Sequence, residues 1–180
     1  MPRRPREQHA GAFYHVTQRA TDQEILFADV YDRVGFDQLL RRTAKRYAWE
    51  IHDQCQLTNH FHLLVLTRRP TIAAGMQYLN ARHVEAYNGR HGRRGTLVQG
   101  RYGAKLVETE EYYLQVRGYL ALNPVDAGLV RAAEDWPWSG FGGAGKVSPP
   151  PDDRLKRFVR AYAERRRRLT DMAVRDASGL

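Results

Sequence analysis

Two histidines in the segment QLTNHFHLLVLT (56–67) have a spacing that suits a metal ion. His60 and His62 flank Phe61 at the start of the apolar run 63–66, which predicts a buried strand. Because successive side chains of a strand point to opposite faces, the two imidazoles share a face and can be adjacent ligands of one ion. A pair of hydrogen-bonding histidines at a sheet surface explains the same pattern. No Cys-x-x-Cys or His-Glu-x-x-His motif supplies a third ligand, so that ligand stays open.

Tyrosines are the second group that could do chemistry. Ten occur in the 180 residues, and three of them lie in EEYYLQVRGYLALNP (110–124). Tyr119 and Asn123 are four residues apart, so a helix places them on one face, one turn apart. A tyrosine hydroxyl can act as a covalent nucleophile. Tyrosines at this spacing are also common in cores and interfaces, with their hydroxyls in water.

The charge balance points to nucleic acid. The chain has 29 Lys and Arg against 20 Asp and Glu, for a net charge of +9. The segment NGRHGRRGTLVQGRYGAK (88–105) contains no acidic residue, its glycines let the backbone approach phosphates, and arginine forks match phosphate oxygens. A solvated loop is the alternative, but the absence of compensating acids favours nucleic acid. The candidate DNA-binding residues here are Arg90, Arg93, Arg94, Arg101 and Lys105.

The order of expected elements predicts the fold class. Alternation and helical spacing predict strand 12–20, helix 29–47, strand 49–57, the histidine strand, helix 71–87 and a strand–turn–strand at 96–109. A further helix follows Thr109 and is expected to end near Asn123, because Pro124 disfavours helical dihedrals there. This order is that of an α+β, ferredoxin-like sandwich, with a central antiparallel sheet that carries the histidine pair and helices packed on it.

Within strand 49–57, alternation places four residues on one face. These residues are Trp49, Ile51, Asp53 and Cys55. The segment SPPPDD (148–153) reads as part of a linker at 146–153. Beyond it, 154–180 is expected to form a basic amphipathic C-terminal helix and a tail.

Several classes of protein are disfavoured. No apolar run approaches the roughly 18 residues of a membrane span, and the first residues contain no apolar core of a secretory signal. The chain has one cysteine, Cys55, so no internal disulfide can form. We expect a cytoplasmic, nucleoid-associated protein.

The motifs together resemble the REP-associated tyrosine transposases of bacteria, a branch of the single-tyrosine HUH transposases. The resemblance covers most of residues 1–141. It rests on PRRPR, GAFYHVT, NHFHLLV, MQYLN, YNGRHGRRGTLVQGRY, YLALNPVDAGLV and WPWS, in this order. It implies that residues 1–145 form an HUH single-tyrosine transposase domain that acts on single-stranded DNA with REP-like hairpins, as a monomer or homodimer.

The resemblance also assigns roles to residues. It implies that Tyr119 is the nucleophile, which forms a 5′-phosphotyrosine, and that His60, His62 and Asn123 hold Mg²⁺ or Mn²⁺. The leading PRRPR, with Arg3 and Arg4, would contact the short guide sequence that accompanies the hairpin. The activity implied is cleavage and rejoining of single-stranded DNA. A hairpin-binding protein of the same fold that no longer cuts is the main alternative, and an unrelated histidine-metal hydrolase is disfavoured by the basic segment.

Overall fold

The computed structural model describes residues 8–21, 24–143 and 147–178. The predicted DNA contacts Arg3 and Arg4 lie outside the described residues. Within the described part, no helix combines the length and the apolar character that a bilayer-crossing segment needs.

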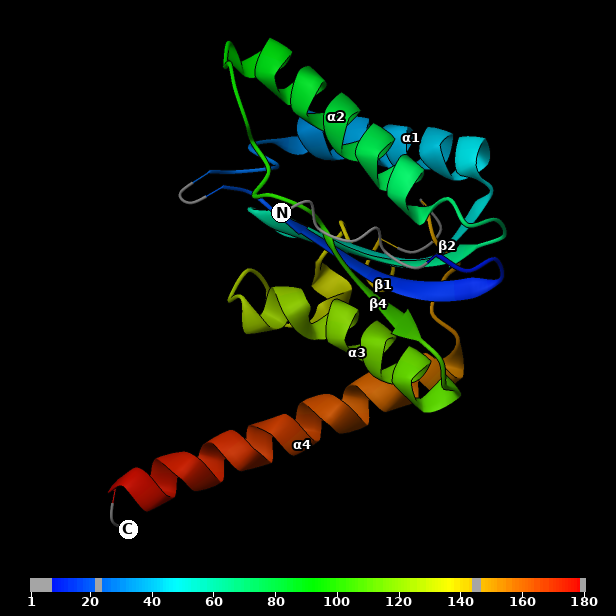
Figure 1. Cartoon of the computed structure of the whole chain (residues 1–180). Helices are drawn as coiled ribbons and strands as arrows, with labels where there is room; N and C mark the ends of the chain where they lie inside the picture. The colour runs from blue at the N-terminus through cyan, green and yellow to red at the C-terminus, as the bar shows by residue number, and fades with distance from the viewer. Residues whose placement is uncertain (1–7, 22–23, 144–146, 179–180) are drawn as a thin grey trace, which may run out of the picture.

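Four strands and four α-helices make up the described chain (Figure 1). In chain order they are β1 (Ala12–Arg19), α1 (Val30–Tyr47), β2 (Trp49–Gln56), β3 (His60–Thr67), α2 (Ile72–His91), β4 (Gly103–Val107), α3 (Glu110–Asp126), a 3₁₀ turn (Ala133–Asp135) and α4 (Asp153–Ser178).

The strands form one antiparallel sheet in the order β2-β3-β1-β4, which is the order of a ferredoxin-like sandwich. Figure 1 shows α1 and α2 covering one face of the sheet and α3 the other, with the first turns of α4 against the outer side of α3. The predicted fold class is therefore confirmed. The histidine strand β3 lies inside the sheet, between β2 and β1, so its backbone is held on both sides.

The side chains of β3 alternate between two hydrophobic clusters. Phe61, Leu63 and Val65, on the face opposite the histidines, pack with α1 and α2. Leu64 points the other way and packs with Leu120 of α3. The histidine face of β3 is thus the face that α3 covers.

The prediction that Trp49, Ile51, Asp53 and Cys55 share one face of β2 is wrong. A bulge between Ile51 and Asp53 shifts the register against β3. The extra residue, His52, reverses the alternation, so Trp49 and Ile51 pack toward α1 and α2, whereas Cys55 packs toward α3.

Two helices run further than the sequence predicts. Helix α2 continues to His91, so the first residues of the basic segment are helical. Helix α3 passes through Pro124 and ends at Asp126. Both Asn123 and Pro124 are buried, and this packing of the last turn outweighs the local preference of a residue before proline.

The strand–turn–strand predicted at 96–109 is only partly present. Its second half forms β4, whereas its first half contributes a single bridge between Val98 and Ala20.

His83 gives the fold a measurable acid sensitivity. It is buried between α1 and α2, where its Nε2 donates to the Leu26 carbonyl at 3.0 Å, and burial lowers its pKa to about 4. In the unfolded state His83 takes up a proton below about pH 6.5, whereas in the folded state it stays neutral down to about pH 4. Its contribution to the free energy of unfolding is therefore fully present above about pH 6.5 and is lost as the pH falls toward 4.

We predict that His83→Gln, whose amide can still donate to Leu26, reduces the loss of stability in acid. Between neutral pH and about pH 5, wild type should lose about 2 kcal/mol of unfolding free energy more than the variant does. Urea unfolding of both proteins at the two pH values measures this difference. Equal losses in the two proteins would contradict it.

Candidate active site

Pairing of β1 with β3 builds the centre of the site. Thr17 lies opposite His62 in the ladder, and His15 lies two residues before Thr17 on the same face. The Nδ1 atom of His62 is 3.1 Å from His15 Nε2 and 3.1 Å from Thr17 Oγ1. With its proton on Nδ1, His62 can donate to one of these two atoms and keeps a free lone pair on Nε2.

The Nε2 atom of His62 is buried and has no hydrogen-bond partner among the described residues. Burial, with smaller contributions from His15, His60 and Arg19, lowers the pKa of His62 to about 2. The imidazole is therefore neutral at physiological pH. A neutral imidazole with an engaged Nδ1 and an unpartnered Nε2 is the usual state of a metal ligand.

His60, the first residue of β3, also has its Nδ1 engaged. Its Nδ1 lies 2.8 Å from the Asn59 side-chain oxygen, and its ring centroid is 5.0 Å from that of His62. Burial, followed by the nearby charge of Arg19, lowers the pKa of His60 to about 4. The structure therefore brings the two predicted ligands together as neutral imidazoles with Nε2 free of these contacts.

Tyr119 lies directly beside the histidines. Its ring centroid is 5.3 Å from that of His62 and 6.0 Å from that of His15, edge-on in both cases. The side chain is 43% exposed, whereas its neighbours on the helix, Gly118 and Leu120, are buried. The predicted nucleophile is thus next to the imidazole with the unpartnered nitrogen and is open to a ligand.

A buried ion pair positions the helix that carries Tyr119. Arg117 of α3 donates from Nε to Asp53 of β2 at 3.1 Å, and both side chains are almost fully buried. Burial raises the pKa of Asp53 to about 6, and Arg117 opposes that rise. At its other end, α3 is capped by the Thr109 hydroxyl, which accepts from the Tyr112 N–H.

Asn123 lies one turn beyond Tyr119 on α3. It is buried, and its Nδ2 has no hydrogen-bond partner among the described residues. Ala127, one further turn along, lines the same cavity as His60. Helix α3 therefore runs past both histidines, with Tyr119 beside His62 and its C-terminal end near His60.

These donors fit a divalent ion. Two neutral imidazoles and one amide make a mixed nitrogen and oxygen set, and each of His62 and Asn123 has a buried polar atom that the protein leaves unpaired. The Asn123 amide can turn its oxygen to the place that Nδ2 occupies, since the two ends have almost the same shape.

The basic segment divides into two groups. Arg90 pairs with Asp29 and Asp32, and Arg93 pairs with Glu24. The compensating acids that are absent from 88–105 thus come from the start of α1 and the segment before it. These two arginines join α2 to its neighbours.

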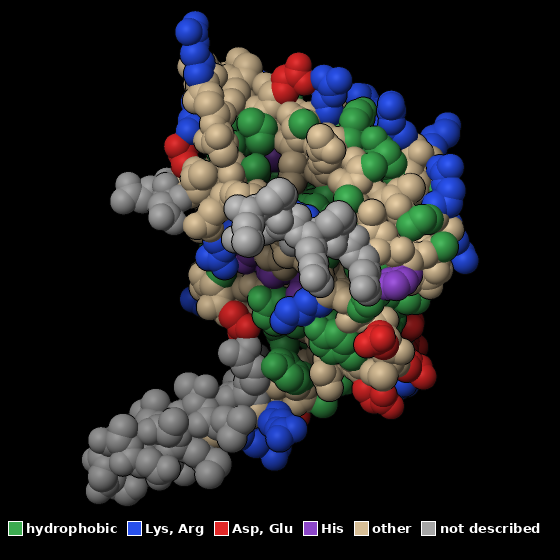
Figure 2. Space-filling view, viewed as in Figure 1, with side chains coloured by type: hydrophobic (Ala, Val, Ile, Leu, Met, Phe, Trp, Pro, Cys, Tyr) green, Lys and Arg blue, Asp and Glu red, His purple; other side chains and the backbone are tan. Residues whose placement is uncertain are grey.

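The remaining cations of the segment are Arg94, Arg101 and Lys105. No ion pair involves them within the part of the chain that the structure describes. Lys105, on β4, lines the same cavity as His62 and Tyr119. Figure 2 shows histidine side chains at the surface, in the middle of the face in view, with Lys or Arg side chains beside them.

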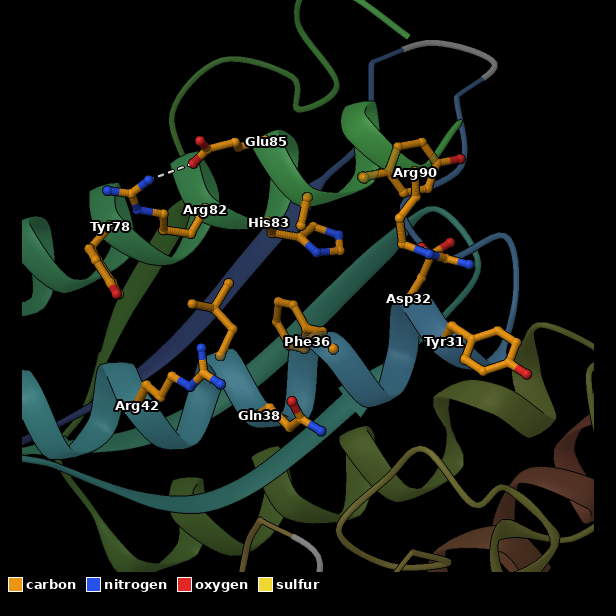
Figure 3. A pocket seen from close by; sticks show the side chains of 14 residues that line it. Tyr31, Asp32, Phe36, Gln38, Arg42, Tyr78, Arg82, His83, Glu85 and Arg90 are labelled. Carbon is orange, nitrogen blue, oxygen red and sulfur yellow. Dashed lines mark hydrogen bonds and ion pairs between the residues drawn. The ribbon is translucent and has the colours of Figure 1, made fainter. Parts of the chain in front are cut away.

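A second group that could hold a metal lies on the other side of the sheet. Asp29, Asp32 and His91 place one ligand atom each within 4.8 Å of one another. Residues of α1 and α2 line a second cavity, and Figure 3 shows Arg90 extended to Asp32 at one end of it. Arg90 lowers the pKa of Asp29 to about 2, and the carboxylates already accept from its guanidinium, so positive charge is present there without an ion.

Sequence reasoning missed His15 and Thr17. Both lie in a strand with clear alternation, so their shared face could be predicted. Their position opposite His62 could not, because it depends on which strands pair and in which register.

The two candidate metal-binding groups can be distinguished by titration with Mn²⁺. We predict that His62→Ala weakens Mn²⁺ binding at neutral pH by at least about tenfold, because it removes an imidazole whose Nε2 has no partner among the described residues. The matched change His91→Ala should leave binding unchanged. Electron paramagnetic resonance of free Mn²⁺ measures both, and the opposite pattern would place the ion at the α1–α2 end.

No family model and no curated protein matches the sequence. Among solved structures, a REP-associated tyrosine transposase bound to a REP hairpin aligns with a TM-score of 0.68 and 19% identity, over 83% of this chain and 89% of that chain. A crystal structure named as that of a transposase, from Deinococcus radiodurans R1, aligns with a TM-score of 0.45 and 18% identity, over 66% of this chain and 95% of that chain. The chain thus has the fold of the REP-associated tyrosine transposase.

Proposed function

We propose that the chain is a metal-dependent endonuclease and strand transferase for single-stranded DNA that carries hairpins, and that it acts through a 5′-phosphotyrosine at Tyr119. The observation that carries this proposal is the exposed Tyr119 beside His62, whose Nε2 is buried and unpartnered. The fold shared with a hairpin-bound transposase supports a DNA substrate.

Tyr119 would supply the nucleophile. Its phenolic oxygen attacks the phosphorus, a tyrosine–phosphate bond forms, and the bond from phosphorus to the 3′-oxygen breaks. The phenol gives up its proton and the departing 3′-oxygen takes one up. A phenolate is a better leaving group than an alkoxide, so a 3′-hydroxyl can reverse the step and reseal the strand.

His60, His62 and Asn123 would hold the divalent ion, Mg²⁺ or Mn²⁺. When bound, the ion would polarise the phosphate and stabilise charge on the departing oxygen. His15 and Thr17 would keep the His62 ring oriented through its Nδ1. Because β3 is paired on both sides, the ligands would change little in position between the free and bound states.

The unpaired cations of the basic segment would bind the DNA backbone. Arg94, Arg101 and Lys105 are available for this role, whereas Arg90 and Arg93 are engaged with carboxylates and would serve the fold first. Lys105 borders the cavity of Tyr119 and would contact the strand nearest the reacting phosphate.

Tyr119→Phe tests the nucleophile. The variant keeps the aromatic ring beside His62 and loses only the reacting oxygen, so we expect no covalent adduct with a labelled hairpin-bearing single strand in Mn²⁺. Denaturing gel electrophoresis detects the adduct. Tyr112→Phe is the matched control, because Tyr112 lies on the same helix and lines the same cavity. An adduct in Tyr119→Phe that disappears in Tyr112→Phe would move the nucleophile to Tyr112.

Metal dependence is tested by removal of the ion and of one ligand. We expect EDTA to stop cleavage and Mn²⁺ in excess to restore it. We expect His60→Ala to lower the cleavage rate by a factor of about 100 or more, from the loss of a ligand to the Lewis acid. Binding of the same DNA without metal is the control for folding and should change little. Cleavage that persists in both conditions would remove the ion from the reaction.

A further inference from the structure

A cavity of about 700 Å³ beside Tyr119 is formed partly by α4, a helix with no part in the chemistry above. The sheet and α3 supply one wall, including Tyr119, His62 and Lys105. Helix α4 supplies the other wall through Phe158, Tyr162 and Arg165. None of the described residues that line this cavity is acidic.

Gly118 explains how α4 comes so near to Tyr119. A Cβ atom at Gly118 would lie 2.5 Å from a ring carbon of Phe158, which is closer than such atoms approach. Only a residue without a side chain lets Phe158 sit directly on α3, one residue before Tyr119. Leu155 and Val159 are buried in a cluster with residues of α3 and fix the register of α4.

That register presents a flat aromatic surface to the cavity. Phe158 and Tyr162 are four residues apart on α4, and their rings are stacked, with centroids 6.1 Å apart and planes inclined by 17°. Tyr162 is 40% exposed, so one of the two rings is open to a further planar group. Burial of α4 against α3 does not need this exposed ring, because Leu155 and Val159 already supply the apolar contact.

Positive charge surrounds the same surface. Arg165 follows Tyr162 on α4, and Arg19 and Lys105 border the cavity from β1 and β4. None of the three forms an ion pair with a described carboxylate. An exposed aromatic ring beside uncompensated cations suits an unpaired nucleotide, whose base stacks while its phosphate pairs.

We propose that the first turns of α4 form one wall of the single-strand groove, in which Tyr162 stacks on an unpaired base next to the reacting phosphate and Arg165 binds a neighbouring phosphate. This proposal rests on the proposed function for the occupant, single-stranded DNA. It adds a part of the chain, α4, and a mode of contact, base stacking, to the site.

Binding without cleavage tests the stacking contact. Each variant is made in full-length Tyr119→Phe protein, and the probe is a mixed-sequence single strand of about 12 nucleotides, within the span of a single-strand groove. We expect Tyr162→Ala to weaken binding, measured by fluorescence anisotropy, by about fivefold to a hundredfold. Tyr162→Phe, which keeps the ring, should stay within about twofold of the parent.

Tyr31→Ala is the matched control. Tyr31 is a more exposed tyrosine, at 71%, in the first turn of α1 on the other side of the sheet, and its removal should not change binding. Arg165→Gln should reduce the slope of log affinity against log salt by about 0.7, the value for one phosphate of a single strand. A strand with 2-aminopurine at successive positions should show one position whose quenching on binding is lost in Tyr162→Ala.

The outcomes separate the inference from the proposed function. Unchanged binding in Tyr162→Ala overturns the stacking role, whatever the chemistry at Tyr119. Equal weakening in Tyr162→Ala and Tyr162→Phe also overturns it, because the hydroxyl and not the ring would then make the contact. Weakening confined to Tyr162→Ala supports the groove even if the wild-type protein forms no adduct at Tyr119. That second result would contradict only the catalytic proposal.

Discussion

The buried ion pair between Asp53 and Arg117 sets the geometry on which the candidate site depends. It joins β2, at the edge of the sheet, to α3, two residues before Tyr119. Removal of one partner would leave an uncompensated charge in the core, at a cost of about 3–5 kcal/mol. Apolar contacts such as that between Leu64 and Leu120 hold the helix on the sheet, but they are not directional. The ion pair adds direction and so determines how far along the sheet Tyr119 lies.

The candidate site shows which features of a sequence are local and which are not. His60 and His62 share a face through strand alternation alone, and the order of elements was enough to predict the ferredoxin-like sheet. Tyr119 and Asn123 could be placed on one helix face, but their position near the histidines needed a resemblance to a known family. The division of the chain at 146–153 stays a prediction.

Other features depend on partners that are distant in the sequence. Arg90 and Arg93 looked uncompensated because their acids lie about sixty or more residues earlier in the chain. The nearness of Phe158 to Tyr119 depends on Gly118, whose role appears only when two helices are packed. Charge and spacing within one segment therefore overstate how many cations are available for DNA. In three dimensions the cations of this segment divide into Arg90 and Arg93, which pair with carboxylates, and others such as Lys105, which lines the cavity beside Tyr119.

The bulge at His52 allows one strand to serve both layers of the sandwich. Before it, Trp49 packs with the helices of one face, and after it Asp53 reaches the helix of the other. Loss of a single residue here would turn Asp53 away from Arg117 while most of the strand could still pair. The length of this strand is therefore under a stricter constraint than its composition. Among homologues, we expect insertions and deletions to be tolerated in the connecting loops long before they are tolerated between positions 49 and 53.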